Sequence, residues 1–437
     1  MGCEIKSVKA RRVWDSRGIP TVECEIATGK GVFSGIVPSG TSAGKHEALE
    51  LRDGGRKFGG KGVEKAVENV NESIAKAVSG NVFESLKELD NTLIKLDGTE
   101  NKSRLGANAI LGVSIAACRA FAAEDEKTLY EFIKLESGSK NMALPIPQMV
   151  VIEGGKHGHK STDLQEFMVV PNGFKSFTEA FDAGVDVYHS IKAELKKSGF
   201  HTNIGKEGAF APNLENNKKA FDFMMKGIES AGYAPGKEVS LALDSAASEF
   251  FSGGKYLLKT ENKELSGTEM VSYYEEIAGS YPIISIEDGM AEDDWAGWSS
   301  LNAKIGKNVM VVGDDLTVTN VKRIQKAIDE KAINSVLVKI NQIGTVSETI
   351  DAVNLCKKAG FASVVSHRSG ETEDVFISDL VVGLGCGWCK FGAPARSERN
   401  AKYNQLLRIE EKLGGKGKYF GKNAIRAKQQ VLNSSGL

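Results

Sequence analysis

The sequence has almost no net charge, since 56 lysines and arginines nearly balance 57 aspartates and glutamates. A protein that binds nucleic acid usually carries a clustered basic excess, and none is visible here, so we expect no nucleic-acid partner. This balance does not exclude a small anionic ligand, because local charge rather than the total decides its binding.

Long apolar runs are also lacking. We expect no segment that spans a bilayer and no secretory signal at the start. The opening Met1-Gly2-Cys3 is a poor myristoylation signal, because Lys6 stands where that signal requires Ser or Thr. These absences predict a cytoplasmic protein without a membrane partner.

Cysteine is scarce, with six residues in a chain of 437. In a long chain without a leader, these are most simply reduced thiols. Cys386 and Cys389 form a CxxC pair, but no second Cys or His pair completes a zinc site. A thioredoxin-like pair needs an early position at a helix start, whereas this one follows an apolar run at 381–384 that we interpret as a strand. We therefore expect two buried thiols without a redox or metal role.

The first part of the chain is typical of strands followed by helices. Residues 4–13 and 21–36 are rich in β-formers. Valine and isoleucine recur at helical spacing over 62–79. Two further helices are predicted, over 83–95 and 106–124. Residues 135–147 contain Ser, Gly, Asn and two prolines, which indicates a boundary between domains.

The second part alternates short apolar runs with amphipathic helical segments. From residue 283 onward the spacing is about one βα unit, roughly 25–30 residues. Alternating strands and helices imply a parallel sheet. The predicted fold is therefore α/β, with a (β/α)8-type barrel over 139–437 preceded by a smaller α+β domain over 1–138.

Charged residues or histidine end the apolar runs of this second part. Taken singly, any of them could be a solvated loop residue or half of an ion pair. A charge at the end of a buried strand is costly unless it is used or paired, and the C-terminal ends of barrel strands open on one face. We expect six such residues to converge there: Asp244, Glu287, Asp314, Lys339, His367 and Lys390.

These six residue types suit a particular chemistry. Three converging carboxylates repel one another, and oxygen ligands in small number favour Mg²⁺. Lysines in the same pocket bind an anion or act as a base. Residues 367–370 (HRSG) offer a guanidinium and a hydroxyl for a phosphate. Together they indicate a small phosphorylated acid whose carboxylate meets the metal, with proton abstraction next to that carboxylate.

These residues lie in stretches that resemble the enolase family, in order along nearly the whole chain. The most specific are 15–18 (DSRG), 37–40 (VPSG), 47–53 (EALELRD), 105–112 (LGANAILG), 165–168 (QEFM), 285–288 (SIED), 313–320 (GDDLTVTN), 339–345 (KINQIGT), 366–374 (SHRSGETED) and 392–399 (GAPARSER). The resemblance implies a homodimeric lyase of glycolysis and gluconeogenesis that interconverts 2-phosphoglycerate and phosphoenolpyruvate with two Mg²⁺. Sites of the enolase superfamily use a Lys or His base with one or two Mg²⁺.

The resemblance also implies a role for each matching residue. Asp244, Glu287 and Asp314 would bind the tighter Mg²⁺, and Ser39 would ligate a second Mg²⁺. The other implied roles are Lys339 as the base at C2, Glu207 with help from Glu166 in departure of the C3 hydroxyl, His157 on a closing loop, Lys390 on the substrate carboxylate, Arg368 and Ser369 on the phosphate, and His367 and Gln165 as further substrate contacts.

The sequence departs from the family's motifs around the expected site. Residues 153–160 read EGGKHGHK, where the family reads NGGSHAGN. Lys206 replaces an aspartate directly before Glu207, and should lower the pKa of Glu207 if it points inward. Gly289 stands in place of proline, and residues 39–44 (SGTSAG) exchange small residues.

Two other interpretations therefore stay open. One is an enolase-derived structural or binding paralogue with weak or lost catalysis, which Lys206 and the rewritten 153–160 segment favour. The other is a superfamily member that acts on a different carboxylate. The retained 367–369 (HRS) stretch argues for a phosphate and against this last interpretation.

Overall fold

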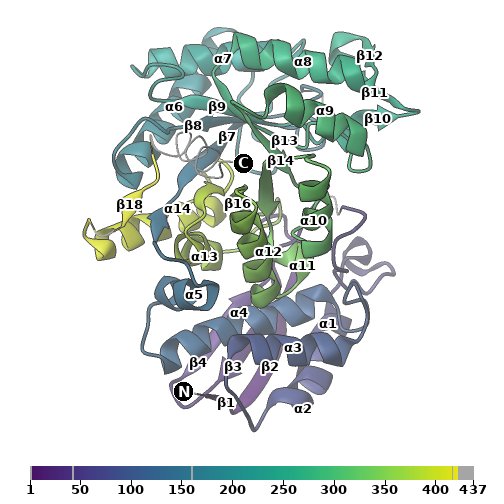
Figure 1. Cartoon of the computed structure of the whole chain (residues 1–437), viewed down its shortest axis with the longest axis vertical. Coiled ribbons are helices and arrows are strands. Elements are labelled where there is room, and N and C mark those ends of the chain that lie inside the picture. Colours follow the sequence, from purple (N-terminus) through teal and green to yellow (C-terminus); the bar gives the residue numbers. More distant parts are fainter. Residues whose placement is uncertain (1, 42–43, 159–160, 416, 422–437) are drawn as a thin grey trace.

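The N-terminal part of the molecule combines small antiparallel sheets with a layer of helices, in the lower half of Figure 1. The structure is a computed structural model that describes residues 2–41, 44–158, 161–415 and 417–421. The elements of this part are β1 (Cys3–Ile5), β2 (Ser7–Trp14), β3 (Pro20–Ala27), β4 (Val32–Ile36), the 3-10 turn η1 (Lys57–Gly60), α1 (Glu64–Asn69), the π-helical turn η2 (Val70–Ile74), α2 (Ala75–Val78), β5 (Asn81–Phe83), α3 (Leu86–Asp97), α4 (Ala107–Glu124) and α5 (Leu129–Ser137).

Alternation along β3 explains how this part packs. Val22, Cys24 and Ile26 are fully buried, and Glu23 and Glu25 between them face Arg11 of β2. Helix α4 packs on β3 and β4. Its Gly112 lies so close to β3 that an added Cβ would sit 2.5 Å from the Cys24 sulfur, so a larger residue would push helix and sheet apart.

Helix α4 corrects one expectation about membranes. Its 18 residues have the length and the mean hydropathy, 1.2, of a membrane-spanning helix. However, 83% of this window is buried inside the protein, because the helix is apolar on all sides and forms the core of the N-terminal part.

Eight strands of the second part close into a barrel, in the upper half of Figure 1. In order round the barrel they are β7 (Ile146–Glu153), β8 (Glu166–Val170), β9 (Ser240–Asp244), β13 (Ile283–Glu287), β14 (Met310–Gly313), β15 (Ser335–Val338), β16 (Ala362–Ser366) and β17 (Gly387–Lys390). The predicted (β/α)8-type barrel is confirmed.

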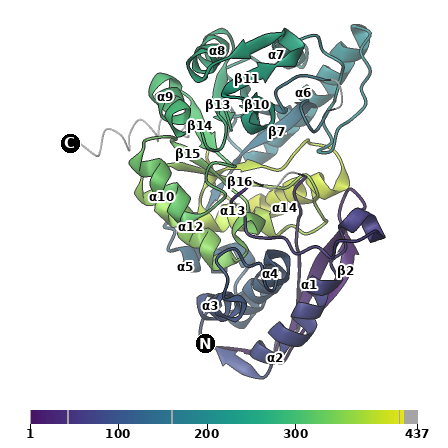
Figure 2. The same cartoon turned by 90° about the vertical axis from the view of Figure 1, so that its right-hand side faces the viewer.

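Helices surround this barrel, as Figure 2 shows from the side. They are α6 (Phe177–Lys197), α7 (Asn217–Ser230), α8 (Gly267–Ser280), α9 (Trp295–Ile305), α10 (Val321–Asp329), α11 (Ile340–Ile343), α12 (Val346–Lys358), α13 (Phe376–Leu384) and α14 (Ser397–Leu413). Short additions are β6 (Ala143–Leu144) paired with β18 (Lys418–Tyr419), the 3-10 turns η3 (Ala247–Phe250) and η4 (Lys259–Glu261), and the three-stranded sheet of β10 (Phe251–Ser252), β11 (Lys255–Leu258) and β12 (Lys263–Leu265). Helix α5 packs on α13 and so ties the N-terminal part to the barrel.

The expected parallel sheet is wrong at one strand. Strand β8 runs antiparallel to both β7 and β9. A parallel connection needs a crossover, usually a helix, and the described residues between β7 and β8 contain none. As a result β8 presents its first residue, Glu166, at the same end of the barrel as the last residues of its neighbours, Glu153 and Asp244.

The apolar run at 381–384 is also not the strand that its sequence predicted. It lies at the end of helix α13, and the strand that leads to Lys390 is the separate β17. All nine residues of α13 are buried, and a continuous apolar run does not distinguish a buried helix from a strand. Cys386 and Cys389 are buried, free thiols as expected, and burial raises the pKa of Cys386 to about 12.

Candidate active site

A polar cavity opens at the end of the barrel where the six predicted strand-end residues lie. All the predicted site residues except Glu287 and Ser39 line it. The lining is Gly40, Thr41, His157, Gln165, Glu166, Glu207, Asp244, Ala246, Glu249, Asp288, Asp314, Asp315, Lys339, Ser366, His367, Arg368, Ser369 and Lys390. Glu287 lies directly beneath it, bonded to Lys390, so the predicted convergence of the six is confirmed.

Lys390 is the charged centre of one wall. Its Nζ lies 2.9 Å from carboxylate oxygens of Asp244, Glu287 and Glu166, three residues from three different strands. All four side chains are buried. Burial and the neighbouring Asp244 raise the pKa of Glu287 well above its ordinary value despite Lys390.

Lys339 forms a second ion pair beside this centre. Its ammonium contacts Asp314 Oδ2, and Gln342 donates to the other oxygen of Asp314 at 2.8 Å. The Asp314 carboxylate holds the pKa of Lys339 above its ordinary value, although burial alone would lower it. In turn Lys339 keeps the pKa of Asp314 below its ordinary value against the effect of burial.

The charges of these side chains are compatible with a bound divalent cation. Among the described residues, the four buried carboxylates of Glu166, Asp244, Glu287 and Asp314 contact the ammonium groups of Lys390 and Lys339, and Glu166 also contacts His157. Carboxylates outnumber cations in this cluster, which suits an added Mg²⁺, and all the donors are oxygens. The strand-end donor set therefore fits the metal that the sequence predicts.

Two groups of described residues have ligand atoms close enough together to hold a metal ion. One group is Asp288, Asp314 and Asp315, and the other is His157, Glu166 and Glu207. Asp314 alone is shared with the predicted metal triad, because Asp244 and Glu287 are bonded to Lys390 in this structure.

The opposite wall joins two histidines to Glu207. His367 Nε2 lies 3.0 Å from Glu207 Oε2, and His157 Nδ1 lies 3.7 Å from Glu207 Oε1 and 3.4 Å from Glu166 Oε1. Burial would raise the pKa of Glu207, but the histidines outweigh it and hold the pKa well below its ordinary value. Burial likewise opposes protonation of His157, but the surrounding carboxylates raise its pKa to about 9.

Arg399, which sequence reasoning missed as a site residue, orders this wall. It is fully buried, and its Nη1 lies 2.8 Å from His367 Nδ1. Since a guanidinium can only donate, Nδ1 is an acceptor and the ring hydrogen of a neutral His367 sits on Nε2, facing Glu207. Burial lowers the pKa of His367, which favours that neutral form. Arg399 also donates to the carbonyls of Arg368 and Ser369, both at 2.6 Å.

The predicted phosphate cradle is occupied by the segment that follows Ser39. Arg368 Nη1 pairs with Glu47 at 3.0 Å, and the hydroxyl of Thr41 lies 2.7 Å from that of Ser369. Ser39 is buried outside the cavity, where its hydroxyl donates to Glu50 and accepts from Arg52. Its predicted role at a second Mg²⁺ is not visible in this arrangement and stays a prediction.

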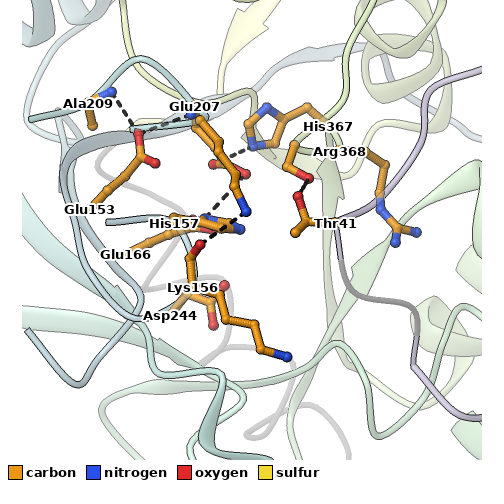
Figure 3. A network of polar contacts seen from close by, with 12 residues as sticks. Thr41, Glu153, Lys156, His157, Glu166, Glu207, Ala209, Asp244, His367 and Arg368 are labelled. Atoms are coloured by element: carbon orange, nitrogen blue, oxygen red, sulfur yellow. Dashed lines mark hydrogen bonds and ion pairs between the residues drawn. The ribbon is translucent and has the colours of Figure 1, made fainter. Parts of the chain in front are cut away.

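The departures from the family's motifs have clear positions. Glu153 is buried, and its Oε1 accepts the backbone N–H groups of Glu207 and Ala209 (Figure 3). Burial and Glu207 raise the pKa of Glu153 to about 8. The exposed Lys206 donates to the Lys156 carbonyl at 3.1 Å, so the pKa of Glu207 is lowered by the histidines rather than by an inward-pointing Lys206.

The other departures contribute less. An added Cβ at Gly289 would lie 2.8 Å from Leu301 Cδ2, so the glycine fits close packing against α9. His159 and Lys160 of the rewritten segment, and Ser42 and Ala43 of the first loop, lie outside the described residues.

The missed residues divide into three kinds. Glu47, Asp288, Asp315 and Arg399 stand inside stretches that already carried the family resemblance, so a charged residue within a specific motif was a usable signal. Glu153 gave only its departure from the motif as a signal. Thr41 lines the cavity close to the predicted Ser39 and had no signal beyond that proximity.

The fold and the site together define an α/β barrel with an acid–lysine cluster at the end of the barrel where such folds carry their active sites. Comparison with known families agrees with this class. The family described as Enolase, C-terminal TIM barrel domain, matches residues 141–428, and the family described as Enolase, N-terminal domain, matches residues 5–133. The chain therefore belongs to the enolase family.

Proposed function

We propose that this protein interconverts 2-phosphoglycerate and phosphoenolpyruvate, with two Mg²⁺, in glycolysis and gluconeogenesis. The observation that carries the proposal is the pairing of two walls across one cavity. One wall holds Lys339 and Lys390 among four buried carboxylates, and the other holds Glu207 between two histidines. A base and an acid on opposite walls suit removal of a proton from one carbon and a hydroxyl from the next.

The chain's residues would divide the reaction as follows. Lys390 holds the substrate carboxylate, and Arg368 and Ser369 hold the phosphate. Lys339 takes the proton from C2, and the electrons of that C–H bond form the C2–C3 double bond. The C3 hydroxyl leaves as water after accepting a proton from the wall of Glu207, Glu166 and His157, on which His157 is the protonated group, so one water and phosphoenolpyruvate result.

Lys339 must be a neutral amine to act as this base. In the structure it is held protonated by Asp314, and Asp244 and Glu287 are held by Lys390. Mg²⁺ bound by Asp244, Glu287 and Asp314 would supply the positive charge that these carboxylates now draw from the lysines, and would stabilise charge on the substrate carboxylate. Released from Asp314, Lys339 loses the attraction that raises its pKa.

A binding or structural paralogue with weak catalysis is the second candidate. It is favoured by the contacts that Glu47 makes with Arg368 and Thr41 with Ser369, because both predicted phosphate ligands are engaged by the protein itself. A catalyst must exchange these contacts for substrate, whereas a scaffold would keep them.

The decisive experiment follows phosphoenolpyruvate by ultraviolet absorbance after mixing protein, Mg²⁺ and 2-phosphoglycerate. We expect turnover that the Lys339→Ala variant lacks. Product formation no faster than that of the variant would sink the proposed reaction. Calorimetry with Mg²⁺ on wild type and on Asp244→Asn then tests the metal site without relying on activity, since the variant should bind more weakly.

We also propose a cytoplasmic homodimer, on family resemblance together with one surface feature. Trp14 is 49% exposed and makes an edge-to-face contact with Phe58, and the Arg12 guanidinium lies over both rings. An exposed aromatic cluster of this kind is typical of an interaction surface. Light scattering should give twice the chain mass for wild type and a lower mass for Trp14→Ser; a wild-type monomer would contradict the dimer.

A further inference from the structure

Glu153 occupies an unusual place for a buried carboxylate. It is the last residue of β7, it is fully buried, and it is not among the residues that line the cavity. Its Oε1 accepts the backbone N–H of Glu207 at 3.1 Å and that of Ala209 at 2.9 Å. Its own backbone N–H donates to the Phe210 carbonyl at 2.8 Å, so strand end and turn are joined through both backbone and side chain.

The turn at 205–209 is shaped around this carboxylate. Two N–H groups of the turn converge on one oxygen, as in the backbone concavities that bind anions. Gly208, between the two donors, has a φ of +91°, which favours glycine. An added Cβ at Gly205 would lie 2.2 Å from Glu153 Oε2, so the turn passes the carboxylate too closely for any side chain there.

A second tie joins the same two segments from the outside. The Lys206 ammonium donates to the Lys156 carbonyl at 3.1 Å. Lys156 in turn pairs with Glu249. The segment that carries His157 and the turn that carries Glu207 are thus bound to each other by Glu153 on the buried side and by Lys206 on the exposed side.

We propose that Glu153 is a positioning residue that fixes the backbone of Glu207, so that the Glu207 carboxylate meets His367 and His157. The barrel helps to hold this turn, because the Ala393 N–H, just after β17, donates to the Glu207 carbonyl at 3.1 Å, but Glu207 itself lies in a turn rather than at a strand end. Among the described residues, Glu153 accepts the Glu207 N–H, and the two histidines contact the Glu207 carboxylate. The role rests on the proposed function, because it assigns Glu153 to departure of the C3 hydroxyl and leaves proton removal by Lys339 untouched.

The test separates these two half-reactions. In D₂O, exchange of the C2 proton of 2-phosphoglycerate, followed by NMR, reports on Lys339, and formation of phosphoenolpyruvate reports on the whole reaction. For Glu153→Ala we expect kcat for dehydration to fall about 100-fold, because a misplacement of about 1 Å costs that much. C2 exchange should stay within about threefold of wild type, since Lys339 does not contact the turn. Glu153→Gln keeps the accepting oxygen and should lose less than about tenfold.

Three further variants make the outcome specific. Glu207→Gln should show the same split as Glu153→Ala, and Lys339→Ala should lose both half-reactions. Glu215→Ala removes an exposed acid between α6 and α7 and should change neither. A Glu153→Ala variant that loses both half-reactions equally, or neither, overturns the positioning role.

Two other outcomes are kept distinct from this one. A wild-type protein that shows neither exchange nor dehydration refutes the proposed function itself. If the melting temperature shows that Glu153→Ala does not fold, Glu153→Ser serves instead, because its short side chain keeps a polar group but withdraws it from the turn. It should show the same split to a smaller degree, and equal loss in both measurements again overturns the proposal.

Discussion

The two walls of the cavity are held in place by different means. On one wall Asp244, Glu287 and Lys390 are the last residues of barrel strands, and Asp314 and Lys339 each directly follow one. On the other wall Glu207 sits in a turn and His157 in a loop, and Glu153, Arg399 and Lys206 hold the backbone around them. The strand wall is positioned by the hydrogen bonds of the barrel, whereas the loop wall is positioned by a few polar side chains.

This difference predicts how each wall responds to change. Removing a charge from the strand wall leaves the backbone in place but exposes uncompensated buried charges, so both stability and activity should fall. Removing a tie from the loop wall leaves the charges balanced but lets the catalytic groups move, so activity should fall more than stability.

The largest effect should come from Lys390→Ala. It removes the ammonium that three buried carboxylates share, and breaking a buried pair in this way costs roughly 3–5 kcal/mol. We expect a sharply lower melting temperature in metal-free buffer and no measurable turnover. Added Mg²⁺ should restore part of the stability, because it binds the same carboxylates. A variant that melts like wild type without metal would show that these carboxylates are not charged together.

The second largest effect should come from removing the metal. Chelation should abolish turnover and lower the melting temperature of wild type, and Mg²⁺ should restore both. At 100 times its dissociation constant a ligand stabilises the folded state by about 2.7 kcal/mol. Loop-wall variants such as Glu153→Ala should keep this Mg²⁺-dependent shift, because their change lies away from the strand-end carboxylates. Loss of the shift in such a variant would show that the two walls are not independent.

Asp90 offers a contrast within the N-terminal part. It is fully buried in α3 and accepts the backbone N–H of Ser347 in α12, but no cation is among the causes of its pKa shift. Burial raises its pKa from 3.8 to about 6, so the folded state binds more protons than the unfolded state between these values. Stability therefore falls as pH rises through this window, by about 3 kcal/mol for this group.

The Asp90→Asn variant should lack that decline. The melting temperature of the variant, relative to wild type, should rise between pH 4 and pH 6 and stay constant above pH 7. Asp314 should contribute the opposite pH dependence of stability, because Lys339 lowers its pKa. A constant difference at all pH values would mean that Asp90 is ionised in the folded protein at low pH as well.

On the loop wall, Arg399→Lys should lower kcat by about 10–100-fold, the usual cost of losing a residue that orients a catalytic ligand. Lysine cannot reach His367 Nδ1 and the carbonyls of Arg368 and Ser369 together, because it lacks the planar fork of donors. Arg408→Lys in the same helix is the matched control, since Arg408 donates only to Gln405 among the described residues. Equal activity of both variants would remove Arg399 from the site.

The sequence anticipated the strand wall better than the loop wall, for a physical reason. A charge that ends a buried apolar run is visible in the sequence, and the barrel brings all such ends to one face, so Asp244, Glu287 and Lys390 were foreseen. Glu166 escaped this rule because β8 is antiparallel and brings its first residue to the mouth; only the family resemblance supplied it. The run at 381–384 was misread because a buried helix and a buried strand are equally apolar.

The contacts of the loop wall could not be predicted from the sequence. Glu153 and Lys206 were visible only as departures from the family's motifs, and nothing in their spacing says that one carboxylate accepts two N–H groups 54 and 56 residues away. Side-chain-to-backbone bonds between distant loops depend on the final path of the chain. The same holds for Lys206, whose direction the sequence left open and whose ammonium donates to the Lys156 carbonyl.

The smallest effect should come from Lys206→Met, which keeps the length and apolar stem of the side chain. It removes one exposed hydrogen bond to the Lys156 carbonyl, worth about 0.5–1.5 kcal/mol, or roughly two- to tenfold in kcat. Because this charge is exposed and does not contact Glu207, the alkaline limb of the pH–rate profile, which the proton donor sets, should stay where it is in wild type. If Lys206 instead acted electrostatically on Glu207, the limb would move to higher pH and the rate difference would shrink at high salt. Whether that limb shifts therefore decides between two roles for Lys206. It either holds the backbone of the loop wall in place through its hydrogen bond, or it acts electrostatically on Glu207.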